Sequence, residues 1–92
     1  MPKVIVYIKD YCPYCTKAKN LLKKKGVAFE EIDITHDTKL REYVFKESGQ
    51  MTVPQIFIND KSVGGCDDLY ALNAIGELDK ILQPVVIAPL DA

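Results

Sequence analysis

The chain has 92 residues, 27% of them charged, and its formal net charge at pH 7 is −1. This size suits one core, so we predict that residues 1–92 form a single domain. The balanced charge argues against a disordered chain and against a strongly electrostatic nucleic-acid partner. The apolar run over residues 4–8 is too short for a membrane span or a signal-peptide core. We therefore expect a cytoplasmic protein without membrane association.

The first half of the chain predicts a strand, a helix and a second strand. Residues 3–8 are β-branched and apolar without polar alternation, which is typical of a strand buried on both faces. Pro13 suits the first turn of a helix, and Gly26 suits the cap that ends it. Residues 29–34 read as the next strand. A strand–helix–strand unit of this kind should be parallel and right-handed.

The second half predicts a helix, a hairpin and a further helix. Residues 35–38 offer capping side chains for a helix that reaches about Glu47. A hairpin over residues 54–58 and 62–63 should turn at residues 59–61. The last helix should begin near Asp67, end at Gly76 and bury its apolar side chains, namely Leu69, Leu72 and Ile75. A short turn over residues 79–82 follows. The tail, residues 84–92, shows no periodic pattern of apolar residues, so its role is left open.

Cys12-Pro13-Tyr14-Cys15 lies between the first strand and the first helix. Two thiols at this spacing fall within one helical turn, so they can close a small disulfide ring. Cys12 lies at the helix N-terminus, where unpaired N–H groups and the macrodipole favour a thiolate. A thiolate is the attacking species in disulfide exchange. The motif therefore predicts a redox pair.

The competing interpretation of the two cysteines is half of a zinc site. The chain has three cysteines and one histidine, so only Cys66 and His36 remain as further ligands. Their spacing does not match the ligand pattern of tetrahedral zinc. We therefore expect no metal site, and we interpret His36 as a surface residue.

Three segments in this order resemble the dithiol glutaredoxins, the small bacterial ones above all. They are the Cys12–Cys15 motif, Thr52-Val53-Pro54 before a strand, and the Gly-Gly-Cys-Asp-Asp segment over residues 64–68. The resemblance covers about residues 3–83. It implies an α/β fold of the thioredoxin-like type, with a central four-stranded mixed sheet flanked by helices. It also implies a cis bond between Val53 and Pro54.

The resemblance further implies a glutathione-dependent disulfide oxidoreductase. The Cys12 thiolate would attack glutathione mixed disulfides and protein disulfides, Cys15 would resolve the intermediate, and glutathione would recycle the enzyme. Its partners would be glutathione and glutathionylated or disulfide-containing proteins, ribonucleotide reductase being one candidate. Such an enzyme would act as a monomer and would need no metal cofactor.

The same resemblance assigns residues to glutathione. The backbone of Val53 would pair with the cysteinyl part, and the helix start after Gly65 would bind the glutamyl carboxylate. Asp67 would receive the glutamyl ammonium, while Lys9 and Arg41 match positions that meet the glycyl carboxylate. The predicted glutathione-binding residues are Lys9, Tyr14, Arg41, Thr52, Val53, Pro54, Gly65, Cys66 and Asp67.

Three points remain open at the level of the sequence. Met51 stands where many glutaredoxins carry Arg or Lys, so one carboxylate contact is missing. Cys66 is either an inert, buried thiol or a third site of glutathionylation or intermolecular disulfide formation. Two other functions compete: a redoxin of the same fold served by thioredoxin reductase, and a homodimer that holds a [2Fe–2S] cluster with two glutathiones.

Overall fold

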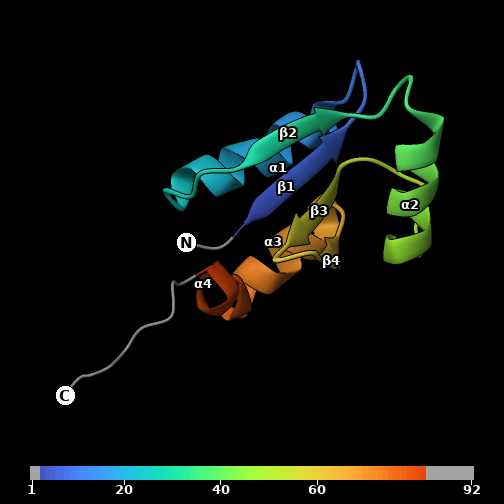
Figure 1. The fold of residues 1–92 in the computed structure, drawn as a ribbon. Helices are drawn as coiled ribbons and strands as arrows, with labels where there is room; N and C mark the ends of the chain where they lie inside the picture. The colour runs from blue at the N-terminus through green and yellow to red at the C-terminus, as the bar shows by residue number, and fades with distance from the viewer. Residues whose placement is uncertain (1–2, 83–92) are drawn as a thin grey trace.

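The computed structural model describes residues 3–82, so the tail over residues 84–92 lies outside the described range. Four strands and four helices follow one another in the order β1, α1, β2, α2, β3, β4, α3 and α4 (Figure 1). Their bounds are β1 Val4–Ile8, α1 Pro13–Lys24, β2 Glu30–Asp33, α2 Thr38–Ser48, β3 Gln55–Ile58, β4 Lys61–Gly64, α3 Cys66–Ala74 and α4 Glu77–Leu82.

The strands form one mixed sheet in the order β2-β1-β3-β4. β1 is parallel to β2 and antiparallel to β3, and β3 is antiparallel to β4. Figure 1 shows α1 and α3 together behind the sheet and α2 set apart from them. The predicted four-stranded mixed sheet and the parallel strand–helix–strand unit are both confirmed. Among residues 3–82, no helix is long and apolar enough to cross a bilayer.

Strand β1, one of the two inner strands, is buried on both faces, as its unbroken apolar run predicts. Val4 and Val6 pack into the core beneath α1, α3 and α4. Ile5 and Tyr7 belong to a second core that includes Val44 of α2. Successive side chains of a strand point to opposite faces, so helices on both faces require apolar residues at every position.

The predicted helix ends are also found. Cys12 precedes α1 as its N-cap, and Gly26 has a φ of 71° just after the helix. The Asp37 carboxylate accepts the Leu40 N–H at 3.0 Å and caps α2, which Gly49 ends in a left-handed conformation. These local signals therefore define where α1 and α2 begin and end.

One core prediction is wrong. Leu69 is fully buried and Leu72 is half-buried, but the side chain of Ile75 is 71% exposed. Ile75 is the C-cap of α3, and the positive φ of Gly76, 80°, redirects the chain there. Leu78, in the next helix, is buried in the core beneath α3 instead.

Two element boundaries also differ from the sequence prediction. The hairpin turn consists of Asn59 and Asp60 alone, both with positive φ, so Lys61 already belongs to β4. A two-residue turn of this kind matches the twist of its flanking strands. The segment predicted as a short turn is part of helix α4, which begins at Glu77.

Candidate active site

The two cysteines of the motif lie at the start of α1 and are joined by a disulfide bond. Cys12 is the N-cap, and its Sγ accepts the N–H of Cys15 at 3.1 Å. The carbonyl of Cys12 accepts the N–H groups of Cys15 and Thr16. The predicted pairing of Cys12 with Cys15 is therefore confirmed, and the reactive sulfur itself caps the helix.

The two sulfurs differ in their access to solvent. Cys15 is only 3% exposed and lies on the inner face of α1 with Ala18 and Leu22. Cys12 is partly exposed at the end of the helix. Cys12 is therefore the sulfur of the pair that a molecule from solvent can reach.

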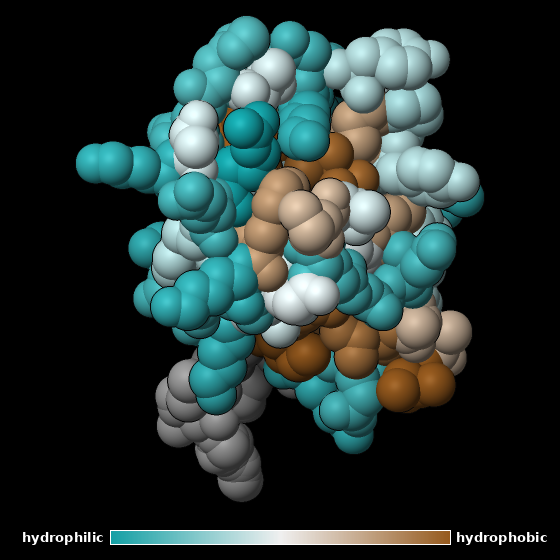
Figure 2. Space-filling model, turned by 90° about the vertical axis from the view of Figure 1, so that its right-hand side faces the viewer, coloured by the Kyte–Doolittle hydropathy of each residue, from teal (hydrophilic) through white to brown (hydrophobic). Residues whose placement is uncertain are grey.

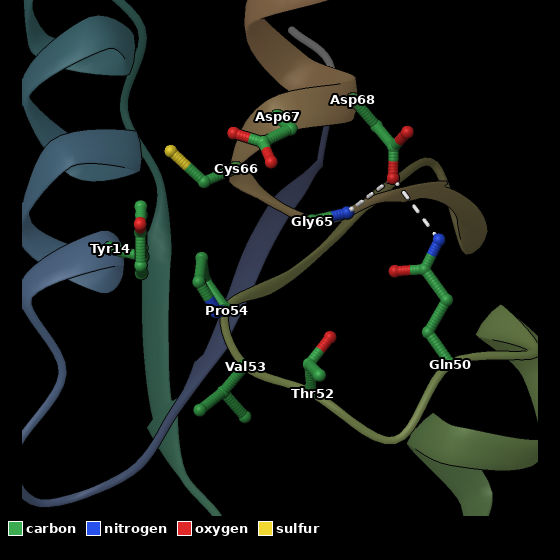
Figure 3. Close-up of a pocket in the computed structure, with 9 residues that line it drawn as sticks. All are labelled: Tyr14, Gln50, Thr52, Val53, Pro54, Gly65, Cys66, Asp67 and Asp68. Atoms are coloured by element: carbon green, nitrogen blue, oxygen red, sulfur yellow. Dashed lines mark hydrogen bonds between the residues drawn. The ribbon is translucent and has the colours of Figure 1, made fainter.

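A groove of about 450 Å³ lies beside this helix turn (Figure 3). One wall is the loop before β3, the other is the start of α3, and Tyr14 of α1 borders it on a third side. Its lining residues are Tyr14, Gln50, Thr52, Val53, Pro54, Gly65, Cys66, Asp67 and Asp68. The structure thus brings together seven of the nine residues predicted to bind glutathione.

The wall before β3 includes a stretch of backbone without backbone hydrogen-bond partners among the described residues. The peptide bond between Val53 and Pro54 is cis, as predicted. The N–H and carbonyl of Val53 make no backbone hydrogen bond within residues 3–82. An extended peptide can therefore pair with Val53 as an added strand would.

The wall formed by α3 combines close backbone approach with two carboxylates that differ in role. A Cβ atom on Gly65 would lie 3.2 Å from the carbonyl oxygen of Pro54, which only a residue without a side chain avoids comfortably. Asp68 Oδ2 accepts the Gly65 N–H at 3.0 Å and caps the helix. Asp67 is exposed and makes no hydrogen bond or ion pair among residues 3–82. Its carboxylate is therefore free to meet a cation.

Cys66 forms part of the groove wall but is not activated. Its side chain is 6% exposed, and its sulfur points toward α1 (Figure 3). Burial raises the pKa of the Cys66 thiol, an effect that Lys17 opposes and Asp67 adds to. The thiol therefore stays protonated at neutral pH, in agreement with its interpretation as a small buried hydrophobe.

Lys9 and Arg41 do not line this groove. The Lys9 ammonium lies 5.7 Å from the centre of the Phe45 ring, and the Arg41 guanidinium donates to the carbonyl of Thr35 at 3.2 Å. Lys9 does border a second hollow, of about 480 Å³, together with the redox pair. The role of Lys9 and Arg41 in binding the glycyl carboxylate stays a prediction.

Two groove residues escaped the sequence analysis. Gln50 was assigned no role, although its amide donates to Asp68 Oδ2 at 3.1 Å. Asp68 is absent from the predicted glutathione-binding residues, and it also lines the groove. Gln50 and Asp68 lie 18 positions apart, and no local pattern marks such a pair. Met51, in contrast, is 78% exposed and does not line the groove.

His, Cys, Asp and Glu side chains can hold a metal ion only where several of them lie together. Over the described range, 3–82, no three His, Cys, Asp or Glu side chains are grouped so that they could hold an ion. His36 is exposed in the loop before α2.

Comparison with protein families adds to this geometry. The family model described as Glutaredoxin matches residues 4–63. The chain belongs to the glutaredoxin family. Over 83 residues it is 53% identical to Glutaredoxin 3 of Escherichia coli K12, covering 90% of this chain and all of that protein. It is 49% identical over 83 residues to a glutaredoxin of Pseudomonas aeruginosa, covering 90% of this chain and 99% of the relative.

Solved structures of glutaredoxins share the fold. The solution structure from Brucella melitensis has a TM-score of 0.79 and 48% identity, covering 94% of each chain. A buckwheat glutaredoxin–glutathione complex has a TM-score of 0.81 and 30% identity, covering 88% of this chain and 76% of the buckwheat chain. The predicted family, its dithiol type and the thioredoxin-like fold are confirmed. This glutaredoxin is a glutathione-dependent disulfide oxidoreductase.

Proposed function

We propose that the groove between residues 50–54 and residues 65–68 binds glutathione and places its sulfur at Cys12. One observation carries the proposal: an unpaired stretch of backbone at Val53 and a free carboxylate at Asp67 lie on opposite walls of the groove. These two features match the two ends of a γ-glutamyl-cysteinyl peptide. A complex with glutathione is known for the buckwheat glutaredoxin, which supports the same ligand here.

The binding mode follows from the groove walls. The cysteinyl part of glutathione pairs with the backbone of Val53, as a strand would. The N–H groups at the start of α3 receive the glutamyl carboxylate, since the helix N-terminus carries partial positive charge. Asp67 receives the glutamyl ammonium. Lys9 and Arg41 serve the glycyl carboxylate from outside the groove.

Reduction of a glutathione mixed disulfide needs Cys12 alone. The Cys12 thiolate attacks the glutathionyl sulfur, a new disulfide forms to Cys12, and the client leaves as a thiolate that takes up a proton. A second glutathione, as its thiolate, then attacks the bound glutathionyl sulfur. Oxidised glutathione leaves, and Cys12 returns as a thiolate.

Reduction of a protein disulfide also needs Cys15. The Cys12 thiolate attacks one client sulfur, which forms a mixed disulfide and releases the other client sulfur as a thiolate. Cys15 then attacks Cys12, which frees the second client sulfur and leaves the disulfide seen in the structure. Two glutathione molecules reopen this disulfide and leave as oxidised glutathione. Each turnover thus moves two electrons from glutathione to the client.

The clients that fit this chemistry are glutathionylated and disulfide-containing proteins of the reducing cytoplasm, ribonucleotide reductase among them. A Cys15→Ser variant cannot release a client by internal attack, so it traps the client on Cys12. Mixed disulfides recovered from such a trap identify the clients, and the absence of ribonucleotide reductase among them would remove that candidate.

A glutathione reductase-coupled assay tests the proposed function. The substrate is a small glutathione mixed disulfide, and the rate is followed as the glutathione concentration rises. We expect saturation with glutathione and little turnover when thioredoxin reductase replaces glutathione reductase. The opposite preference would favour the competing interpretation, a redoxin of the same fold served by thioredoxin reductase.

We also propose that the protein works as a monomer without an iron–sulfur cluster. A cluster shared by two chains needs Cys12 of each chain as a free ligand. Pro13 restricts the active-site turn at the start of α1, and Cys15, in the same chain, competes for Cys12 at high effective concentration. After anaerobic reconstitution with iron, sulfide and glutathione, we expect a colourless monomer on gel filtration. A stable brown dimer with about two irons per dimer would overturn this expectation.

A further inference from the structure

Gln55 is the one polar side chain that is buried among residues 3–82, with an exposed fraction of 0%. It is the first residue of β3 and directly follows Pro54 of the groove wall. Its amide nitrogen donates to the carbonyl of Thr52 at 2.9 Å and to the side-chain oxygen of Gln50 at 3.0 Å. A buried amide thus holds the loop that forms one wall of the groove.

The hydrogen bonds continue from that loop to the opposite wall. The Gln50 amide nitrogen donates to Asp68 Oδ2 at 3.1 Å, and the same oxygen accepts the Gly65 N–H at 3.0 Å. Figure 3 shows these two hydrogen bonds, from Gln50 to Asp68 and from Gly65 to Asp68. The two walls come from segments far apart in the sequence, and this series of side-chain hydrogen bonds joins them.

The orientation of the Gln55 amide is determined by its partners. Both neighbours, the Thr52 carbonyl and the Gln50 side-chain oxygen, are acceptors, so the nitrogen must face them. The Gln55 side-chain oxygen then has no hydrogen-bond partner among residues 3–82. All hydrogen bonds that the Gln55 side chain makes among these residues thus run through its nitrogen, the donor end of the side chain.

We infer that Gln55 is a positioning residue that sets the distance between Val53 and Asp67 for glutathione. Gln55 is fully buried and does not line the groove, so it acts through Thr52 and Gln50. Without its donor, the loop that presents the Val53 backbone loses its bonds to β3, and Gln50 holds it to the start of α3 alone. This inference rests on the proposed binding of glutathione in the groove.

The test is Gln55→Met, which keeps the length of the side chain and removes the donor. We expect the glutathione concentration for half-saturation to rise about three- to tenfold, as for the loss of a buried hydrogen bond. Turnover at saturating glutathione should change less than twofold. Reduction of the Cys12–Cys15 disulfide by dithiothreitol, which makes no glutathione contacts, should keep its rate.

The matched control is Ile58→Val, three positions along the same buried strand. It weakens the core beneath α1 and α3 without touching the hydrogen-bonded series. If general loosening of β3 were the cause, both variants would raise the half-saturation concentration in proportion to their loss of thermal stability. The inference requires that Gln55→Met alone raise the half-saturation concentration of glutathione when the two variants have lost the same thermal stability.

Other outcomes separate the inference from the proposed function. If the parent protein saturates with glutathione and Gln55→Met saturates at the same concentration, the inference is wrong and the function stands. A parent that does not saturate removes the proposed function as well. Should Gln55→Met fail to fold, Gln50→Met breaks the same series at a partly exposed residue. An unchanged half-saturation concentration in that variant would equally overturn the inference.

Discussion

Cys12→Ser is expected to lose reduction of both glutathione mixed disulfides and protein disulfides, by at least about 1000-fold. The hydroxyl of serine does not ionise near neutral pH and cannot form a disulfide. Cys15 cannot take over the attack, because it is 3% exposed and lies on the inner face of α1. The measurement is turnover in the glutathione reductase-coupled assay and in a protein-disulfide reduction assay.

Cys15→Ser should separate the two reactions. Attack on a glutathione mixed disulfide involves only Cys12 and a second glutathione, so this activity should stay within a few-fold of the parent. Protein-disulfide reduction should lose most of its rate, because release then depends on attack from solution rather than by a thiol in the same turn. Thermal unfolding of each reduced protein verifies that both variants are folded.

The division of labour has a clear contrary result. Substantial turnover by Cys12→Ser would mean that another thiol is the nucleophile. Equal loss of both activities in Cys15→Ser would mean that Cys15 takes part in every turnover, not only in the resolution of protein disulfides.

Asp67→Asn is expected to weaken saturation by glutathione about tenfold. The change keeps the shape of the side chain and removes the charge that would meet the glutamyl ammonium. A charge-assisted hydrogen bond contributes about 1.5 kcal/mol at the low end, the appropriate figure for a carboxylate that is exposed before binding. The half-saturation concentration of glutathione, measured at low and at high salt, tests the expectation. The difference from the parent should shrink at high salt.

Glu42→Gln is the matched control for the loss of one negative charge. Glu42 is exposed on α2 and does not line the groove. The Glu42→Gln variant should leave the half-saturation concentration of glutathione unchanged. Dithiothreitol should reduce the Cys12–Cys15 disulfide at the same rate in both variants and in the parent. If Asp67→Asn behaves like Glu42→Gln, Asp67 is only a favourable charge at the start of α3.

The parts of the fold that the sequence predicts best are those whose signals are local. The unbroken apolar run of β1 requires burial on both faces, and Asp37 and Gly49 mark the two ends of α2. The redox pair is local as well, because Cys12 and Cys15 lie within one helical turn. For these features, sequence neighbours decide the structure.

Predictions that depend on distant packing are less complete. Ile75 fits the apolar face of an ideal helix, but α3 ends one residue before it, and the following helix supplies Leu78 to the core. Likewise, no spacing rule pairs Gln50 with Asp68, or explains why a strand between two cores begins with a buried amide at Gln55. These contacts exist only once the loop before β3 and the start of α3 have come together.

The hydrogen bond from the Cys15 N–H to the Cys12 sulfur makes the backbone of α1 sensitive to the state of that sulfur. A thiolate is a stronger acceptor than a disulfide sulfur, so each reaction step alters the environment of the same amide proton. The chemical shift of the Cys15 amide should therefore follow the mixture of disulfide, thiolate and glutathionylated forms. A single backbone resonance would then report the progress of the reaction, without a label on any reactive atom.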